Sequence, residues 1–191
     1  NIAVVFFGEG AANEGVLYES LNIAALYKLP ILFICENNGY STHMPINKIF
    51  SDVNISKKAE SLGVPSFQID GNNVIEIFQT VRNSIKSVRE GRGPTFFECF
   101  TYRWRGHVGP SDDLDKGLRS KKELKYWMTR CPIKKLKVFL EKEKYLSPED
   151  DKFLRNSIQN EISEAIHFAE VSSLPKMSRE LMEKNTFRRI T

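Results

Sequence analysis

Two short apolar segments near the start of the chain, each followed by a polar turn, constrain its fold most strongly. The first, residues 3–7, leads into the glycine-rich turn GEGAANEG, and the second, residues 31–35, leads into ENNGY. Residues 16–27 between them have apolar side chains near helical spacing, and Leu29 and Pro30 follow, where proline ends a helix. This strand–helix–strand unit predicts two parallel strands, each covered on both faces.

Polar side chains stand at the carboxyl ends of both predicted strands. Glu9 follows the first strand and Asn38 follows the second. Because parallel strands open on the same edge of a sheet, we expect the carboxylate and the amide oxygen to lie close together. Oxygen ligands beside a helix N-terminus suit a magnesium-diphosphate group, and Asn13 is expected to cap that helix.

The rest of the chain continues the alternation of strands and helices. Strands are predicted at residues 66–69 and 95–101, helices at 54–62, 73–89, 132–144 and 147–171, and a loop at 39–50. This order predicts an α/β fold with a doubly wound, mainly parallel sheet. We expect residues 1–119 to belong to the α/β domain and residues 120–191 to form a helical C-terminal region of the same domain.

Composition excludes several classes of protein. Of 191 residues 41% are apolar and 27% charged, which is typical of one ordinary globular domain, and the net charge of +4 is too small to predict nucleic-acid binding. Apolar runs fall short of the roughly 20 residues that span a membrane. Because the chain begins without methionine in a buried-looking strand, we expect an N-terminal portion to precede it.

The three cysteines are an odd number without metal-type spacing. Cys35 and Cys99 lie in apolar runs, which predicts buried free thiols in a reducing compartment; a catalytic cysteine is the alternative.

A second polar segment, TYRWRGHVGPSDDLD, follows the fourth predicted strand. It holds Arg103, Arg105 and His107 together with an acidic run, Asp112, Asp113 and Asp115, and its glycines and proline indicate a functional loop. Three partners are open to Arg105: a substrate, a partner protein or the acidic run.

Taken together, these motifs resemble a known family. GEGAANEG followed by ENNGY is similar to the diphosphate–metal motif of thiamine-diphosphate enzymes. The whole stretch from residue 8 to residue 40 closely resembles the alpha subunit of the two-chain 2-oxo acid dehydrogenases, of the pyruvate, branched-chain and acetoin types. FECFTYRWRGH resembles the segment that carries the active-site histidine of that family.

The resemblance implies a thiamine-diphosphate-binding fold and a role for each matching residue. Glu9, Asn38 and the backbone carbonyl of Tyr40 would bind Mg²⁺, and the backbone amides of Gly10 and Ala11 would approach the diphosphate of the cofactor. The family usually has aspartate where this chain has Glu9, whose extra methylene extends the carboxylate by about 1.5 Å.

The resemblance also assigns residues to the reacting end of the cofactor. His107 matches the catalytic, cofactor-contacting histidine, and Arg103 matches a basic residue of the same loop. The implied reaction is oxidative decarboxylation of a 2-oxo acid, or cleavage of acetoin, with transfer of the acyl group to lipoyl. The location would be the bacterial cytosol, or the mitochondrial matrix in a eukaryote.

The partners implied by the resemblance are a beta subunit in an α2β2 heterotetramer and a lipoyl-bearing acyltransferase, without nucleic acid or membrane. The beta subunit would supply the carboxylate that activates the cofactor, so we expect the isolated chain to bind cofactor poorly and to be inactive. Two alternatives stay open: a non-catalytic interaction domain of the same fold, and a Rossmann-type nucleotide-binding protein. The second is weakened because the turn lacks GxGxxG spacing and no ribose-binding acid follows the second strand.

Overall fold

The computed structural model describes residues 1–114, 117 and 119–174. Asp115 of the predicted acidic run and the end of the predicted helical region, after residue 174, lie outside them. The chain divides into two compact units, Asn1–Leu140 and Glu141–Thr191.

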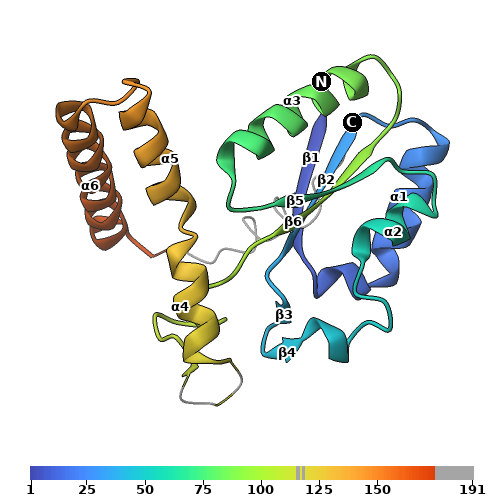
Figure 1. Cartoon of the computed structure of the whole chain (residues 1–191), viewed down its shortest axis with the longest axis horizontal. Helices are drawn as coiled ribbons and strands as arrows, with labels where there is room; N and C mark the ends of the chain where they lie inside the picture. Colours follow the sequence, from blue (N-terminus) through green and yellow to red (C-terminus); the bar gives the residue numbers. More distant parts are fainter. Residues whose placement is uncertain (115–116, 118, 175–191) are drawn as a thin grey trace. The chain divides into compact units, whose positions relative to one another are not determined.

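A four-stranded parallel sheet forms the centre of the first unit, with strand order β1-β2-β6-β5 (Figure 1). The strands are β1 (Ala3–Gly8), β2 (Ile31–Asn37), β5 (Ser66–Asp70) and β6 (Thr95–Phe100). All four strands that the sequence predicted are present, and the predicted α/β fold with a parallel sheet is confirmed.

Helices cover both faces of the sheet (Figure 1). They are α1 (Gly15–Leu26) and α2 (Ile55–Glu60) on one face and α3 (Val74–Arg89) on the other. Phe33 and Phe96 pack with the first pair of helices, whereas Leu32, Ile34 and Phe97 pack beneath α3. Because side chains alternate between the two faces of a strand, the sheet forms two separate cores, as a doubly wound fold requires.

Side-chain caps begin two of these helices. Asn54 and Asn73 accept hydrogen bonds from backbone N–H groups in the first turns of α2 and α3. The prediction that Asn13 caps the first helix was wrong. Asn13 ends a 3-10 turn, Ala11–Asn13, and Glu14 occupies the N-cap position of α1 without a side-chain hydrogen bond.

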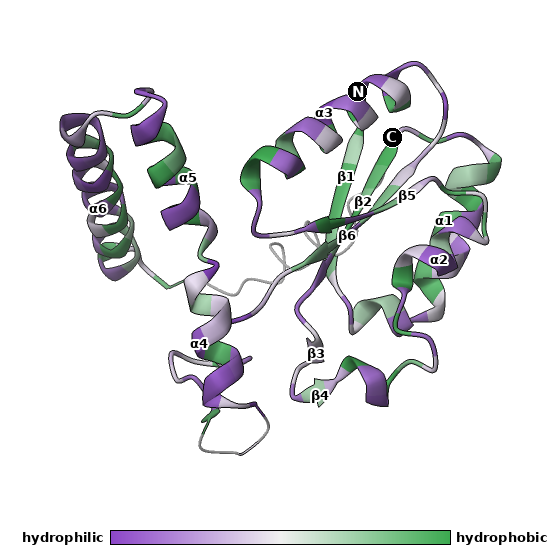
Figure 2. Cartoon of the chain, in the orientation of Figure 1, coloured by the Kyte–Doolittle hydropathy of each residue, from purple (hydrophilic) through white to green (hydrophobic). Residues whose placement is uncertain are grey.

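The first strand departs from its predicted environment. β1 lies at the edge of the sheet, where Val4 and Phe6 are 46% and 65% exposed, so the prediction of cover on both faces was wrong for this strand. Figure 2 shows that β1 carries hydrophobic residues like β2 and β6. The apolar pattern of a strand indicates that its side chains favour burial, but the described residues bury only part of the surface of β1.

The predicted loop at 39–50 contains short regular elements. β3 (Tyr40–Ser41) and β4 (Met44–Pro45) form an antiparallel hairpin, followed by the 3-10 turn Ile46–Lys48. Thr42 has a positive φ of 56° in the hairpin turn. Each strand is only two residues long, too short for an alternating pattern to reveal it.

Three further helices complete the described chain: α4 (Lys121–Thr129), α5 (Pro132–Lys142) and α6 (Pro148–Val171). Ser120 caps α4, and Ser147 and Asp150 form a capping box at the start of α6, which confirms the start predicted there. Figure 2 shows one hydrophobic and one hydrophilic side on α6. Among the helices of the described residues, none combines the length and the apolar composition needed to cross a membrane.

Candidate functional site

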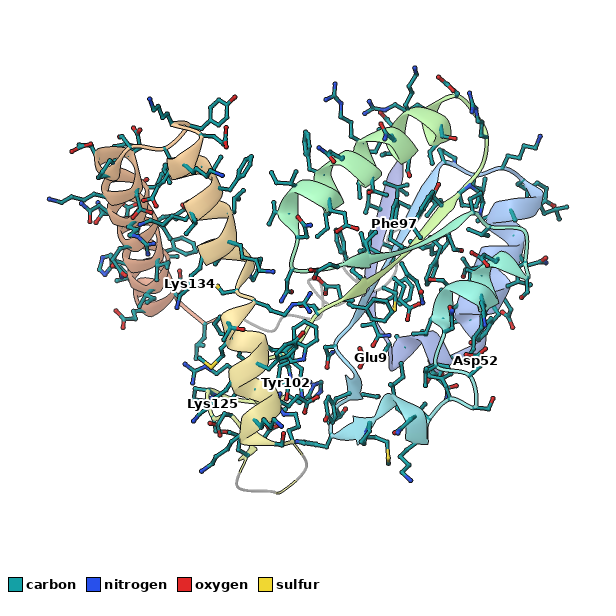
Figure 3. The ribbon with its side chains drawn as sticks, in the orientation of Figure 1. Glu9, Asp52, Phe97, Tyr102, Lys125 and Lys134 are labelled. Carbon is teal, nitrogen blue, oxygen red and sulfur yellow. The ribbon has the colours of Figure 1, made fainter. Side chains whose placement is uncertain are left out.

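The carboxyl ends of β1 and β2 bring Glu9 and Asn38 together. Gly8 pairs with Glu36 in the parallel register, so the residues that follow the two strands lie next to each other at the carboxyl edge of the sheet. Glu9 is 1% exposed, and its Oε2 accepts hydrogen bonds from the backbone N–H of Asn38 at 2.9 Å and from Asn38 Nδ2 at 3.1 Å. Figure 3 shows Glu9 where the sheet leads toward the β3–β4 hairpin.

The amide oxygen of Asn38 accepts no hydrogen bond from the residues that the structure describes. Its Nδ2 faces Glu9, whereas Oδ1 is buried and without a hydrogen bond within the part of the chain that the structure describes. A buried acceptor of this kind normally has a partner, because leaving it unpaired costs about 1–3 kcal/mol. A carboxylate beside an unpaired amide oxygen therefore fits a hard cation such as Mg²⁺.

Tyr40 lies two residues beyond Asn38, at the start of β3. The Tyr40 hydroxyl donates a hydrogen bond to Glu123 of α4, and Tyr102 donates to the same carboxylate oxygen at 3.3 Å. Burial and this hydrogen bond raise the pKa of Tyr40 to about 12. The side chain is thus occupied away from Glu9, which leaves only the backbone carbonyl for the metal-binding role that the resemblance implies.

Acidic, histidine and cysteine side chains do not by themselves form a metal site in the described residues. Within residues 1–114, 117 and 119–174, no group of three or more His, Cys, Asp and Glu side chains could hold a metal ion. A cation beside Glu9 would therefore need amide and carbonyl oxygens as well, and the ligand roles of Asn38 and the Tyr40 carbonyl stay predictions.

Burial raises the pKa of Glu9, while the backbone hydrogen bond from Asn38 and the charge of Arg103 oppose that rise. Desolvation disfavours the ionised carboxylate. A cation bound at this position would favour the ionised form strongly, so proton release and cation binding should be linked.

The glycine turn between β1 and α1 is tightly packed against the hairpin. A Cβ atom on Gly10 would lie 2.9 Å from Ser41 Cβ and closer still to Ser41 Oγ, so any larger residue would displace the hairpin. Ala11 follows and begins the 3-10 turn, while its neighbour Ala12 is fully buried. This close approach gives Gly10 a structural requirement that is separate from the cofactor contact predicted for it.

His107 and Arg103 meet on the exposed loop after β6. Arg103 Nη1 lies 3.3 Å from His107 Nδ1, and Arg103 Nη2 donates to the carbonyl of Thr42 at 2.7 Å. Since an arginine only donates hydrogen bonds, this contact makes Nδ1 the acceptor and places the proton of a neutral imidazole on Nε2. His43 stands close by, with its ring centre 6.5 Å from that of His107.

A buried arginine that sequence reasoning missed holds this loop. Arg119 pairs with Asp113 at 2.5 Å, and it also donates to the backbone carbonyls of Arg103, Arg105 and Asp112. Although burial opposes ionisation of Asp113, the hydrogen bond and charge of Arg119 hold the pKa of that carboxyl below its ordinary value. Both side chains are less than 5% exposed, so the pair fixes the backbone that carries Arg103 and His107.

Among the described residues, Arg105 contacts a backbone carbonyl, and a substrate or a partner protein as its partner stays a prediction. It is exposed and donates to the carbonyl of Pro110 at 3.0 Å, while the acidic Asp113 pairs with Arg119 instead. The histidine of the hairpin, His43, lies 3.5 Å from Asp113.

The cysteines are free and buried, as predicted. Burial raises the pKa of the thiol of Cys35 strongly and that of Cys99 to about 11. Both thiols therefore stay protonated near neutral pH, which argues against the alternative of a catalytic cysteine.

Comparison with known families identifies the class of the protein. The sequence model of the family described as "Dehydrogenase E1 component" matches residues 1–178. The chain belongs to this family.

Relatives with assigned names point to the alpha subunit of the E1 component. The chain is 36% identical over 177 residues to "Pyruvate dehydrogenase E1 component subunit alpha" of Porphyra purpurea, covering 93% of this chain and 51% of the relative. It is 35% identical over 168 residues to "2-oxoisovalerate dehydrogenase subunit alpha" of Bacillus subtilis, covering 88% and 50%. A chloroplastic pyruvate dehydrogenase alpha-3 subunit of Arabidopsis thaliana is 36% identical over 98% of this chain and 42% of its own length.

The chain thus spans about half the length of the relatives it matches. For this member of the E1 family, the structure brings together Glu9 with Asn38, and Arg103 with His107. Sequence reasoning missed Arg119 and the fully buried Glu98, although a charge inside the apolar strand FFECF was an available signal for the latter.

Proposed function

We propose that this chain binds the magnesium-diphosphate end of thiamine diphosphate as part of the alpha subunit of a 2-oxo acid dehydrogenase. The observation that carries the proposal is the meeting of Glu9 with Asn38 at the ends of two parallel strands, with Asn38 Oδ1 buried and unpaired among the described residues. Glu9, Asn38 Oδ1 and the Tyr40 carbonyl would hold Mg²⁺, and the backbone amides of Gly10 and Ala11 would face the diphosphate.

Each group has a separate chemical task. The thiazolium ring of the bound cofactor supplies the electron sink for loss of carbon dioxide from the substrate. Glu9 and Asn38 fix the diphosphate through the metal, and Arg103 holds the ring of His107 so that Nε2 carries the proton. His107 would then direct this Nε2–H, as a hydrogen-bond donor, toward the oxygen of the reacting substrate on which negative charge develops.

The substrate would be a 2-oxo acid of the pyruvate or branched-chain type, because the named relatives act in those two classes. Acetoin is the remaining candidate. A beta subunit would complete an α2β2 assembly and supply the activating carboxylate, and a lipoyl-bearing acyltransferase would take the acyl group. Free buried thiols suit a reducing compartment such as the bacterial cytosol or the mitochondrial matrix.

The test is the magnesium dependence of cofactor binding in the full-length subunit assembled with its beta subunit. Glu9→Ala should abolish Mg²⁺-dependent binding of thiamine diphosphate in calorimetry. Glu14→Ala, which removes an exposed acid from the same turn, should bind as the unaltered protein does. Unchanged magnesium dependence in Glu9→Ala would refute Glu9 as a ligand.

The same measurement separates the proposal from a non-catalytic interaction domain of the same fold. Such a domain would assemble with its partner but show no magnesium-dependent binding of thiamine diphosphate in the unaltered complex. Tight binding by the isolated chain would refute the expectation that it needs its partner.

A further inference from the structure

Glu98 is a fully buried acid in the middle of β6, among apolar neighbours. Its Oε1 accepts a hydrogen bond from Asn37 Nδ2 at 2.7 Å. Its Oε2 accepts from the backbone N–H and the hydroxyl of Ser56, at 3.1 and 2.9 Å, and from Gln68 Nε2 at 3.0 Å. One carboxyl group therefore ties together the end of β2, the start of α2, and β5.

The contact with Asn37 fixes the turn that leads to Asn38. Asn37 is 5% exposed; its Nδ2 is bound to Glu98, and its Oδ1 accepts the backbone N–H of Gly39 at 3.1 Å. The carbonyl of Asn37 also accepts the backbone N–H of Thr101 at 2.9 Å. Gly39 has φ of +83°, a conformation that glycine adopts without strain. Asn38 therefore lies between two residues whose positions depend on Glu98.

We infer that Glu98 is a positioning residue that holds turn 37–39 so that Asn38 Oδ1 and the Tyr40 carbonyl face Mg²⁺. The inference rests on the proposed function, since it concerns the same metal. Glu98 itself would not touch the cation, because its two oxygens already accept four hydrogen bonds. Within the described part of the chain, the oxygen of Asn38 is the one beside Glu9 that is buried without a hydrogen bond.

The hydrogen-bond inventory explains why a carboxyl group is needed. A glutamine at this position has one acceptor oxygen and one NH₂ donor. If the NH₂ of the glutamine faced Asn37, the amide of Asn37 would have to rotate by half a turn. The NH₂ of Asn37 would then face the backbone N–H of Gly39. If the NH₂ of the glutamine faced the other side, the backbone N–H of Ser56 would lose its acceptor. Either arrangement leaves one N–H unpaired, and the first one breaks the turn.

The test compares Glu98→Gln with Ser56→Ala, which removes one donor to the same carboxyl but leaves the Asn37 contact. Both variants are made in the full-length subunit assembled with its beta subunit. Calorimetry with saturating thiamine diphosphate measures the Kd of Mg²⁺, and urea unfolding measures stability. We expect Glu98→Gln to raise the Kd about 10- to 100-fold, and Ser56→Ala to change it less than about twofold, although both lower the urea midpoint.

Asn37→Ala gives an independent measurement. It should raise the Kd of Mg²⁺ as Glu98→Gln does. The Kd of the double variant should be no higher than the higher of the two single-variant values, because both changes break the same connection. This variant also decides the question if Glu98→Gln does not fold.

Two results would overturn the inference: a Kd within twofold of the unaltered protein in Glu98→Gln or Asn37→Ala, or an equal loss of affinity in Ser56→Ala. The second would mean that Glu98 acts only through general stability. Failure of the proposed function looks different, because the unaltered complex itself would then show no magnesium-dependent cofactor binding.

Discussion

Replacement of Arg119 by methionine should release the loop that carries Arg103 and His107. The change removes the ion pair with Asp113 and three hydrogen bonds to backbone carbonyls, while an unbranched apolar stem is kept. It also leaves the Asp113 carboxyl buried, with His43 at 3.5 Å and the charge of Arg103 nearby. The loop should therefore open more readily even where the sheet stays folded.

The expected magnitude follows from these contacts. Four hydrogen bonds at about 1.5 kcal/mol each give about 6 kcal/mol as an upper limit. The carbonyls regain water when the loop opens, and removing one partner of a buried ion pair typically costs about 3–5 kcal/mol. Because residues 107–112 of the loop are exposed, we take the lower end, about 3 kcal/mol, which corresponds to roughly a hundredfold more frequent opening of the loop.

Amide hydrogen exchange of the full-length protein measures this opening directly. The reporter is the backbone N–H of Gly106, which donates to the carbonyl of Ser111 at 2.6 Å across the loop. Its exchange should become about 100-fold faster in Arg119→Met, whereas N–H groups of β6 should keep their protection. Arg105→Met is the matched control, because Arg105 is exposed and makes one hydrogen bond to the carbonyl of Pro110.

Unchanged exchange at Gly106 in Arg119→Met would refute the reasoning, and so would an equal effect in Arg105→Met. The pH dependence adds a second check. Since the folded pKa of Asp113 is lowered, its contribution to loop stability is complete above its ordinary value of 3.8 and is lost as the pH falls through the lower folded value. Protection of Gly106, corrected for the intrinsic pH dependence of exchange, should therefore fall at acid pH in the unaltered protein and should not fall in Arg119→Met.

Three further predictions concern the metal site and the core. Because the pKa of Glu9 is raised in the folded protein, protonated Glu9 stabilises the metal-free fold fully below pH 4.5, and this stabilisation is lost as the pH rises through the folded pKa. Over the same rise in pH the affinity for Mg²⁺ should increase, and calorimetry should show release of a proton on binding. Tyr40→Phe should keep the Mg²⁺ affinity that Asn38→Ala loses, because only the backbone of Tyr40 is implicated; equal losses in this titration would contradict that role. Phe97→Ala should lower the free energy of unfolding in urea by about 3–5 kcal/mol, whereas Phe78→Ala, at an exposed position, should lower it much less. Similar losses in the two variants would contradict the placement of Phe97 in the core.

Local patterns were sufficient to predict the elements that build the sheet. The apolar segments of β2 and β6 are long enough, and bounded clearly enough by Pro30 and Pro94, to read as strands from sequence. The juxtaposition of Glu9 and Asn38 was also predictable, because a parallel strand–helix–strand unit has one carboxyl edge and both residues follow its strands directly. The observed hydrogen bonds confirm that the two residues meet, although the amide nitrogen of Asn38, and not the expected amide oxygen, faces Glu9.

Contacts between distant segments were not predictable in this way. Asn13 fits the residue preference of a helix cap, but it ends the 3-10 turn Ala11–Asn13, and α1 begins only at Gly15. The apolar residues of β1 predicted burial, yet the exposure of Val4 depends on which other segments reach that edge.

The sequence by itself determined the parallel α/β framework, the meeting of Glu9 with Asn38, and the family, because these depend on side-chain periodicity and on short motifs. Only the tertiary structure reveals that Arg119 binds the backbone of the loop that carries Arg103 and His107, and that Glu98 binds Asn37 at the start of turn 37–39. Each of these side chains joins three or more backbone segments, and a hydrogen bond between segments leaves no periodic trace in either of them.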